Sequence, residues 1–536
     1  MRLFRAASLR AADAAAAAAG VPTTTLMHRA GLALAEAALR RWPQADRVLV
    51  ACGPGNNGGD GYVVAQALAA AGRAVTVAEL RPGAAKGDAG WARERLRASG
   101  VEVRWLPAGS DRGSHDGGGD PVPELPLAEH DLVIDALFGT GLSRGLEGTA
   151  ARWIEAINAA GRPVLAVDVP SGVDADRAVS PGPAVRATLT VQLAGAVPAS
   201  LLAPAREAFG ETRVVPIGIP EHLLDAHADA LAVDDAWLRA HAPRRPADAH
   251  KYAAGTVLVV GGSHRYAGAP ELSARGAYRA GAGLVTLIAP ERAPGAWPEV
   301  VWEPRAVDET LAAAVQRVLR GSGGERRATA ALLGPGLEVA PGELARTIEA
   351  LPCPMVLDAG ALHGAVRSAT RTHGGAVLTP HAGEAQRLLR ALAEDDRDEG
   401  DRSKSARTSN GGLVPDARRD PLAAALRLAR AWHAVCVLKG PGTVIADPDG
   451  RWTISAAGTS ALASGGTGDV LAGVIAAFLA AAHRATADDV AIDAWSVCAA
   501  AVHLHGLAGR VAAERGPGIV ASDVAEALPT ARRRHG

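Results

Sequence analysis

Glycine-rich segments that carry carboxylates or amides are the features of this sequence with the clearest chemical meaning. Residues 53–61, GPGNNGGDG, directly follow the apolar stretch 48–52. Glycines leave backbone N–H groups open to an anion, and the N-terminal end of a following helix attracts negative charge. Asn56, Asn57 and Asp60 add polarity that a simple turn does not need, although a tight turn with Asp60 as helix cap is the alternative. The segment predicts a phosphate-bearing ligand, and it lacks the Lys-Ser/Thr ending of a Walker A loop.

Two further polar loops follow apolar stretches in the first half, at residues 133–144 and 167–174. In a parallel sheet the carboxyl ends of the strands form the ligand crevice, so these loops should converge with the first one. Asp135, Asp168 and Ser171 supply hard oxygen atoms, which suit an alkali or alkaline-earth cation. Each aspartate alone is more often a cap or turn residue. Three such loops in one domain predict a functional site.

The second half contains its own glycine-rich segment, SGGTGDVLAG, at residues 464–473. Its glycines can form an anion hole at the start of an apolar helix, and Asp469 lies where it can accept a hydroxyl proton. This arrangement suits phosphoryl transfer to an alcohol. A loop followed by an aspartate helix cap is the structural alternative.

Four other segments of the second half strengthen the catalytic interpretation of Asp469. They read KGPGT at 439–443, LTPHAGE at 378–384, YAGA at 266–269 and LLGPGL at 332–337. The first offers a lysine and open amides, and the second places His381 at a predicted strand end. Together they predict a nucleotide site at the carboxyl ends of a second sheet.

Short apolar stretches alternate with helical stretches throughout, which predicts two parallel sheets covered on both faces. In the first half the predicted strands are 48–52, 74–80, 101–106, 132–137, 163–169, 188–193 and 213–217. In the second half they are 255–261, 285–289, 331–333, 355–358, 376–379 and 435–439. The predicted helices are 61–71, 149–160, 272–282, 469–482 and 493–514.

The stretch between the two halves is rich in Ala, His, Asp and Pro, so it predicts a linker. The expected division is a first domain at 1–225, a linker at 226–250 and a second domain at 251–536. Residues 109–120, 321–327 and 395–416 are rich in Gly, Ser, Asp and Arg, which is typical of surface loops without fixed structure.

Bulk composition excludes several classes of protein. The net charge of −1 provides no field to attract nucleic acid or an anionic membrane. Asp13 interrupts an alanine run that would otherwise resemble a signal peptide, and no stretch is long and apolar enough for a membrane span. We therefore expect a cytoplasmic protein with no nucleic-acid or membrane partner. Four scattered cysteines predict buried free thiols.

Residues 10–220 resemble the NAD(P)H-hydrate epimerase domain, through GPGNNGGDG, DALFGTGL at 135–142 and VDVPSG at 167–172. The resemblance implies a Rossmann-like three-layer α/β/α fold, a potassium ion near Asn57, Asp135 and Ser171, and Asp168 as the acid/base. It also implies contacts to the hydrated nucleotide from Asn56, Asn57, Gly58, Gly59, Asp60, Gly139, Thr140, Gly141, Leu142, Ser143, Arg144, Gly145 and Asp168.

Residues 244–529 resemble the ADP- or ATP-dependent NAD(P)H-hydrate dehydratase, which implies a ribokinase-like α/β fold. The implied contacts to the hydrated dinucleotide are Ala269, Gly336, His381 and Asp469, with Asp469 catalytic. Those to ADP, with which we expect Mg²⁺, are Lys439, Gly440, Pro441, Gly442, Thr443 and Gly468. Two residues depart from the family pattern: Ala382 replaces a proline, and Gly360 replaces an aspartate.

The combination predicts repair of hydrated NADH and NADPH by one chain. The first domain would interconvert the R and S epimers, and the second would dehydrate the S form by phosphorylating its ring hydroxyl and eliminating phosphate. We also expect a homo-oligomer. The alternatives are a ribokinase-like kinase for a vitamin precursor or sugar, which would leave a stable phosphorylated product, and a nucleotide-sensing module without catalysis.

Overall fold

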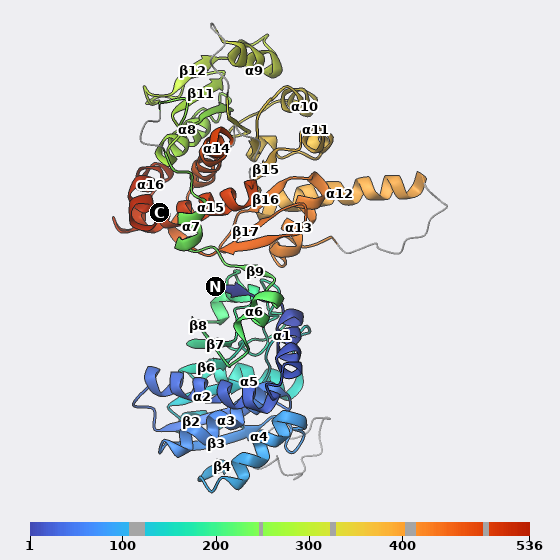
Figure 1. Ribbon diagram of the computed structural model, residues 1–536, viewed down its shortest axis with the longest axis vertical. Coiled ribbons are helices and arrows are strands. Elements are labelled where there is room, and N and C mark those ends of the chain that lie inside the picture. The colour runs from blue at the N-terminus through green and yellow to red at the C-terminus, as the bar shows by residue number, and fades with distance from the viewer. Residues whose placement is uncertain (107–123, 246–249, 322–327, 403–413, 486–492) are drawn as a thin grey trace. The chain divides into compact units, whose positions relative to one another are not determined.

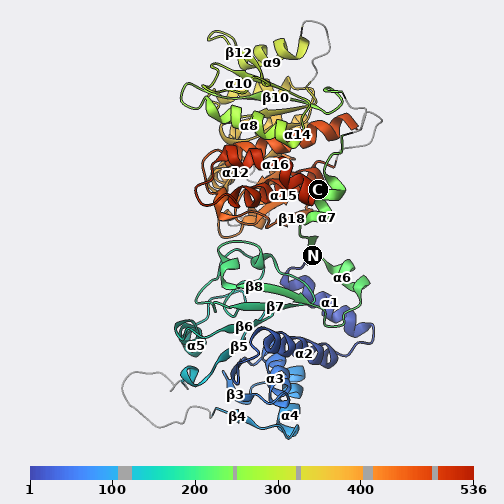
Figure 2. The ribbon, with the colours of Figure 1, turned by 90° about the vertical axis from the view of Figure 1, so that its left-hand side faces the viewer.

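The computed structural model describes residues 1–106, 124–245, 250–321, 328–402, 414–485 and 493–536. The chain divides into two compact units, Met1–Leu231 and Ala232–Gly536. Each unit is an α/β sandwich with its own sheet (Figures 1 and 2). The four cysteines are buried and free, which confirms the prediction for them. None of the described helices is long and apolar enough to cross a membrane.

The first unit is built on a seven-stranded sheet in which every neighbouring pair is parallel. The order is β4-β3-β2-β5-β6-β7-β8. The strands are β2 (Arg47–Cys52), β3 (Ala74–Glu79), β4 (Val103–Trp105), β5 (Leu132–Ala136), β6 (Val164–Val167), β7 (Leu189–Leu193) and β8 (Glu211–Val215). The order reverses between β2 and β5, so the loops after these two strands diverge and leave a crevice.

Helices cover both faces of this sheet, as Figure 2 shows. They are α1 (Ala6–Ala18), α2 (Thr23–Arg41), α3 (Asn56–Ala70), α4 (Gly87–Ala98), α5 (Gly148–Ala159) and α6 (Glu221–His227). Successive side chains of β2 point to opposite faces of the sheet and so belong to two parts of the core. Val48 and Val50 pack toward α2 and α3, whereas Leu49 and Ala51 pack toward α5. This period of two is the pattern of a strand buried on both sides.

The second unit is built on a nine-stranded sheet in the order β12-β11-β10-β13-β14-β15-β16-β17-β18. The strands are β10 (Thr256–Val260), β11 (Leu284–Ala289), β12 (Val301–Pro304), β13 (Ala330–Leu333), β14 (Met355–Leu357), β15 (Ala376–Leu378), β16 (Val435–Leu438), β17 (Thr443–Ala446) and β18 (Trp452–Ser455). Neighbouring strands are parallel from β12 to β16, and β17 is antiparallel to both β16 and β18, so the last three strands form an antiparallel meander. Sequence analysis did not predict β12, β17 or β18.

Helices lie on both faces of the second sheet (Figure 1). They are α8 (Gly268–Ala280), α9 (Leu311–Arg320), α10 (Pro341–Glu349), α11 (Arg367–His373), α12 (Ala382–Arg402), α13 (Pro421–Trp432), α14 (Thr467–Ala485), α15 (Ala494–Ala513) and α16 (Ala521–His535). Helices α8 and α14 approach closely because Gly276 faces the backbone of Val470 and Gly473 faces that of Ser273. A side chain at either glycine would push the helices apart, and α14 carries Asp469 in its first turn.

Three sequence predictions are wrong. Helix α3 begins at Asn56 rather than near Tyr62, because tertiary packing around Gly58 overrides the low helix propensity of glycine. Residues 226–250 are not a plain linker: β9 (Ala230–Leu231) pairs with β1 (Arg2–Leu3), and α7 (Asp235–His241) packs on α15.

The third error concerns residues 395–416, which were predicted to be a loop. Helix α12 continues through their first part and ends at Arg402. Within it, the carboxylate of Asp395 accepts a hydrogen bond from Arg367 at 2.9 Å. A charged composition alone does not distinguish a helix from a loop. Residues 109–120, predicted as a second loop, lie outside the described residues, and so does most of 321–327.

Candidate active sites at the strand ends

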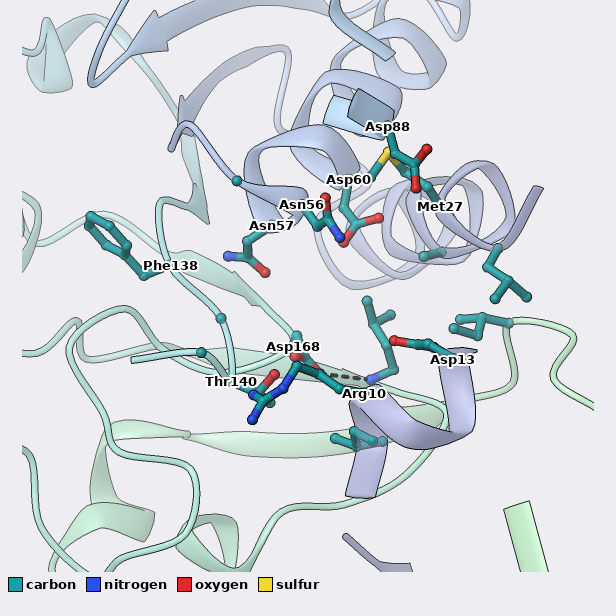
Figure 3. Close-up of a pocket in the computed structure, with 18 of the residues that line it drawn as sticks. Arg10, Asp13, Met27, Asn56, Asn57, Asp60, Asp88, Phe138, Thr140 and Asp168 are labelled. Carbon is teal, nitrogen blue, oxygen red and sulfur yellow. Dashed lines mark hydrogen bonds between the residues drawn. The ribbon is translucent and has the colours of Figure 1, made fainter. Parts of the chain in front are cut away.

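A cavity of about 530 Å³ opens at the carboxyl ends of β2, β5, β6 and β7 (Figure 3). The three loops expected to converge do so here. Of the residues predicted to bind the nucleotide, those on the wall are Asn56, Asn57, Asp60, Gly139, Thr140, Gly141, Leu142 and Asp168. Gly58 and Gly59 instead face Gly53 and Met27 inside the protein, where a side chain would collide. Ser143, Arg144 and Gly145 continue the loop beyond the residues that line the cavity.

Asp168 directly follows β6 and has the left-handed backbone conformation, with φ of 64°. Ala194, which follows the neighbouring strand β7, has the same φ of 64° and lines the same cavity. Non-glycine residues adopt this conformation at a cost of about 1–3 kcal/mol, and such strain concentrates at functional sites. The carboxylate of Asp168 accepts from the backbone N–H of Leu193 at 3.2 Å, and burial raises its pKa to about 6.

Two further carboxylates face this cavity (Figure 3). Asp60 is only 7% exposed, and burial together with the charges of Asp168 and Asp13 raises its pKa well above the usual value. Asp13, on α1, has its pKa raised to about 6 by burial. Sequence analysis treated Asp13 only as an interruption of an alanine run. Its position four residues after the buried Leu9, which also lines the cavity, was the signal that could have marked it, although the Asp13 side chain is itself exposed to solvent.

The residues predicted to hold potassium lie beside this cavity. Asp135 is fully buried, and its carboxylate accepts from the hydroxyl of Ser171 at 2.6 Å and from the backbone N–H of Ser171 at 2.8 Å. Burial raises the pKa of Asp135 to about 6. The side-chain nitrogen of Asn57 is buried without a hydrogen-bond partner. The carboxylate of Asp135, the hydroxyl of Ser171 and the side-chain oxygen of Asn57 are oxygen donors of the type that suits a monovalent cation, whereas the unsatisfied Asn57 nitrogen would need a hydrogen-bond acceptor.

In the second unit, Asp469 occupies the first turn of α14, beneath the glycines of the GGTGD segment. Burial and the charges of Asp358 and Glu384 raise its pKa to about 7, and Lys439 acts in the opposite direction. A carboxylate with such a pKa is partly ionised at neutral pH, so it can accept a proton from an alcohol.

Lys439 lies at the centre of three carboxylates. Its ammonium group donates to Asp358 at 2.7 Å, and Asp358 also accepts from the hydroxyl of Thr379 at 2.8 Å. The surrounding charges of Asp358, Glu384 and Asp469 raise the pKa of Lys439 against the effect of its burial. Lys439 therefore stays charged and holds the ends of β14, β15 and β16 together. Sequence analysis assigned no role to Glu384, although its segment had been singled out.

The KGPGT segment forms the turn between β16 and β17. The hydroxyl of Thr443 donates to the carbonyl of Gly440 at 3.1 Å and closes the turn. Nothing lies within 4 Å of the position that a side chain on Gly440 would take, so a ligand has room on that side, while the N–H of Gly440 donates to the hydroxyl of Thr443 at 3.4 Å. The ammonium of Lys439 lies 3.3 Å from the equivalent position on Gly468, which brings the two predicted nucleotide segments together.

His381 has a structural contact that the sequence did not reveal. Its Nδ1 accepts from the backbone N–H of Gly383 at 3.0 Å and of Glu384 at 3.3 Å, so the ring caps helix α12. Nε2 then carries the proton and lies 3.4 Å from the Glu384 carboxylate. The imidazole is 57% exposed and remains open to a ligand on its outer edge.

The two departures from the family pattern are both accommodated. Ala382 begins α12, where alanine fits the helix without a proline. Gly360 packs against the carbonyl of Leu337, and a side chain there would collide with it. Gly360 donates its N–H to the carbonyl of Gly334 at 3.1 Å. In this backbone the carboxylate that the family carries at this position has no room.

The other two residues predicted to contact the dinucleotide, Ala269 and Gly336, adjoin each other. The Cβ of Ala269 lies 3.4 Å from the position that a side chain on Gly336 would occupy, and Gly336 has a φ of 66°. The described residues contain no group of three or more His, Cys, Asp or Glu arranged to hold a metal ion. Amide, hydroxyl and phosphate oxygens would have to complete any cation site.

Two sheets, each with polar loops and a carboxylate of raised pKa at its strand ends, define a two-domain α/β enzyme. A model of the NAD(P)H-hydrate dehydratase family matches residues 257–530, and one described as YjeF-related protein N-terminus matches residues 23–199. The bifunctional NAD(P)H-hydrate repair enzyme of Moorella thermoacetica is 37% identical over 95% of this chain and 92% of its own. That of Pyrobaculum aerophilum is 36% identical over 96% and 95%. The chain belongs to the bifunctional NAD(P)H-hydrate repair enzymes.

Among solved structures, this chain is similar to an ADP/ATP-dependent NAD(P)H-hydrate dehydratase from Bacillus subtilis that was co-crystallised with ATP/Mg²⁺. The two are 27% identical, with a TM-score of 0.44, over 57% of this chain and 99% of that one.

Proposed function

We propose that the first unit interconverts the R and S epimers of hydrated NADH and NADPH, and that the second dehydrates the S epimer at the expense of ADP. The observation that carries the proposal is the presence, in one chain of this family, of two strand-end sites with carboxylates whose pKa lies near neutrality. A carboxylate of this kind can serve as acid and as base at physiological pH.

In the first unit, Asp168 is the acid/base at the epimerising carbon. The N-terminal end of α3, with Asn56 and Asn57, and the loop at Gly139–Thr140 would receive the phosphates and sugars of the dinucleotide, because open N–H groups and a helix N-terminus attract anions. Asn57, Asp135 and Ser171 would hold a potassium ion, which supplies positive charge among the buried carboxylates.

In the second unit, Asp469 accepts the proton of the ring hydroxyl as that oxygen attacks the phosphoryl group of ADP. The glycines before Asp469 would present N–H groups to the phosphates, and the turn at Gly440 leaves room for them. Lys439 fixes the neighbouring strand ends. Asp358 and Glu384 supply carboxylate oxygens, the donor type that suits the Mg²⁺ expected with the nucleotide. Loss of phosphate from that carbon, together with a proton from the adjacent ring carbon, then restores the double bond of the reduced nicotinamide.

His381, Ala269 and Gly336 would contact the hydrated dinucleotide in this site. The outer edge of His381 is open, and its ring is fixed by the cap on α12. A fixed donor at the rim of the site would orient the substrate toward Asp469.

Purified chain incubated with a mixture of R and S hydrated NADH tests both parts. With ADP, the near-ultraviolet absorbance of NADH should return completely, because the R form is converted to the S form. A stable phosphorylated product without NADH would indicate an ordinary kinase. No change in either epimer would indicate a binding module and contradict the proposal.

A further inference from the structure

The carboxylate of Asp13 faces the same part of the epimerase cavity as that of Asp168, although it comes from a different element (Figure 3). Asp13 is in the middle of α1, on the face that also carries the buried Leu9 and Ala16. It is too far from the helix N-terminus to act as a cap. Aspartate is also a poorer helix former than the alanines around it. The side chain is exposed to solvent on the wall of the cavity, and this placement carries the argument.

Helix α1 is held firmly in place. The side chain of Asp176 accepts from the backbone N–H of Ala6 at 2.8 Å, and that of Asp229 accepts from the N–H of Arg5 at 2.7 Å. These contacts satisfy donors at the start of the helix, and Ala12 and Ala16 are fully buried. The position of Asp13 relative to the cavity is therefore fixed by the fold.

Epimerisation at a hydroxyl-bearing carbon requires one group that donates a proton and another that accepts one. Asp60 is nearly fully buried, and burial raises its pKa well above the usual value, which favours the protonated form over alternation between the two roles. Asp13 and Asp168 line the same cavity from different elements, and each has a pKa raised to about 6, so each can exist as carboxyl or as carboxylate close to neutral pH.

We propose that Asp13 is a second catalytic residue of the epimerase site and exchanges a proton with the ring hydroxyl of the hydrated nicotinamide in alternation with Asp168. The proposal rests on the epimerase function assigned to the first unit. It adds a residue from α1 to a site otherwise built from loops that follow the strands.

The step balances without any further reactant. The protonated carboxyl gives its proton to the ring hydroxyl, the carbon–oxygen bond breaks with its electron pair going to oxygen, and water leaves. The ring nitrogen shares its lone pair with the resulting cation. Water then attacks the opposite face of the same carbon and gives its proton to the other carboxylate. One water leaves and one enters, and the two carboxyl groups have exchanged protonation states, ready for the reverse reaction.

The charged groups around Asp13 are consistent with this role. Asp60 from α3, Asp168 after β6 and Asp88 from α4 line the cavity, and Arg10 lies one turn earlier on α1. Arg10 is the cation on this wall of the cavity among the described residues. It would meet the negative charge of the dinucleotide phosphates and leave Asp13 free for proton transfer.

The decisive experiment replaces Asp13 with alanine, because alanine is favoured in this helix and should preserve the fold. The exchange rate between R and S hydrated NADH would be measured by NMR, in wild type and D13A. We expect kcat for epimerisation to fall by about 100-fold or more with a small change in KM, as for a lost general acid/base. ADP-dependent dehydration of the S epimer, in the same chain, reports that the protein is intact.

Two further measurements separate catalysis from structure. Added formate should restore part of the exchange in D13A, because a small carboxylic acid can enter the vacated space, and it should not stimulate wild type. The control E36Q, on an exposed part of α2, should exchange at the wild-type rate. D13N replaces the carboxyl group with an amide of nearly the same shape, so it tests whether the charge and proton of Asp13 are needed. Its rate of epimer exchange should be as low as that of D13A.

The outcomes distinguish this inference from the proposed function. If wild type does not interconvert the epimers, the epimerase assignment fails. If wild type does and D13A retains its kcat, Asp13 is not catalytic and only this inference fails. A slow D13A that formate does not rescue, combined with a D13N of normal kcat, would also overturn it, because the carboxyl proton would then be unnecessary.

Discussion

The two units place their central carboxylates at the same kind of position but surround them with different charges. Asp168 follows β6 and lines the same cavity as Asp13 and Asp60. The pKa values of Asp60 and Asp168 are raised, so these carboxylates take up protons at a higher pH than free aspartates do. Asp469 lies beside Asp358 and Glu384, but Lys439 stands among them and stays charged. The carboxylates of the first site have raised pKa values and lie beside the proposed potassium ion, whereas those of the second site surround an ammonium group of the chain itself.

This difference matches the chemistry assigned to each unit. Epimerisation needs an acid and a base at once, and carboxylates that share a proton provide both. Phosphoryl transfer needs a base beside a heavily charged nucleotide, so a permanent cation among the carboxylates is useful. The backbone differs as well, because Asp168 has a strained left-handed conformation whereas Asp469 lies in the first turn of a regular helix.

The largest expected effect comes from Asp469→Asn. Dehydration of S hydrated NADH should fall by about 100-fold or more, since the amide cannot accept the hydroxyl proton. Exchange between epimers should be unchanged, because the first unit has its own carboxylates. Parallel measurement of NADH recovery and epimer exchange checks both statements. Normal ADP-dependent recovery in this variant would contradict the assignment of the second site.

Lys439→Met tests the role of the ammonium group in the second site. We expect dehydration at neutral pH to fall by about 10-fold, since Lys439 lowers the pKa of Asp469 and its loss leaves that carboxylate protonated over a wider range. In wild type, the rate should rise with pH through about 7. In the variant, the same rise should occur at higher pH. A pH–rate profile that keeps its wild-type midpoint would show that the lysine does not tune Asp469.

A smaller effect is expected when potassium is exchanged for a large organic cation at constant ionic strength. The rate of epimerisation should fall several-fold, since the buried Asp135 would lose its positive counterpart, and Asp135→Ala should have a similar effect. Dehydration by the same sample serves as the control. An epimerisation rate that does not change with the cation would show that Asp135 and Ser171 only stabilise their loops.

Asp60→Asn tests whether protonation lowers the charge of the first site. The folded pKa of Asp60 is raised, so the folded state binds the proton more tightly than the unfolded state. Its contribution is therefore most favourable at low pH and is lost as the pH rises from about 4 toward the folded pKa. At about pH 7.5 the variant should therefore be more stable than wild type, because the buried carboxylate no longer has to be ionised there.

Urea unfolding at several pH values measures this difference. The stabilities of wild type and Asp60→Asn should differ least well below pH 4, where Asp60 is protonated in both the folded and the unfolded state. A difference that is independent of pH would indicate that Asp60 is ionised in the folded protein. The first site would then carry a negative charge, as the second does, and the contrast between the two units would fail.

The smallest effect is expected from deletion of residues 396–410. Asp395 still pairs with Arg367, and the buried Leu392 precedes the deletion, so the packed part of α12 is kept. Both activities and the melting temperature should stay close to wild type. A large fall in melting temperature would show that these residues support the fold of the second unit.

By itself, the sequence determined the two-sheet α/β architecture, the strands that carry the polar loops, and the carboxylates Asp168 and Asp469. These features depend on local patterns: continuous apolar strands, and glycines next to acidic residues. The family resemblance followed from the same motifs, and the comparisons confirm it.

Only the tertiary structure decided which other charges meet these carboxylates. Asp13 and Asp60 come from different helices, and Lys439 meets Asp358 only because β14, β15 and β16 lie side by side in the sheet. The early start of α3 was also decided by tertiary contacts, since glycines that disfavour a helix locally allow close packing there. Burial and charge proximity set the pKa of each group, and both depend on residues that are distant in the chain.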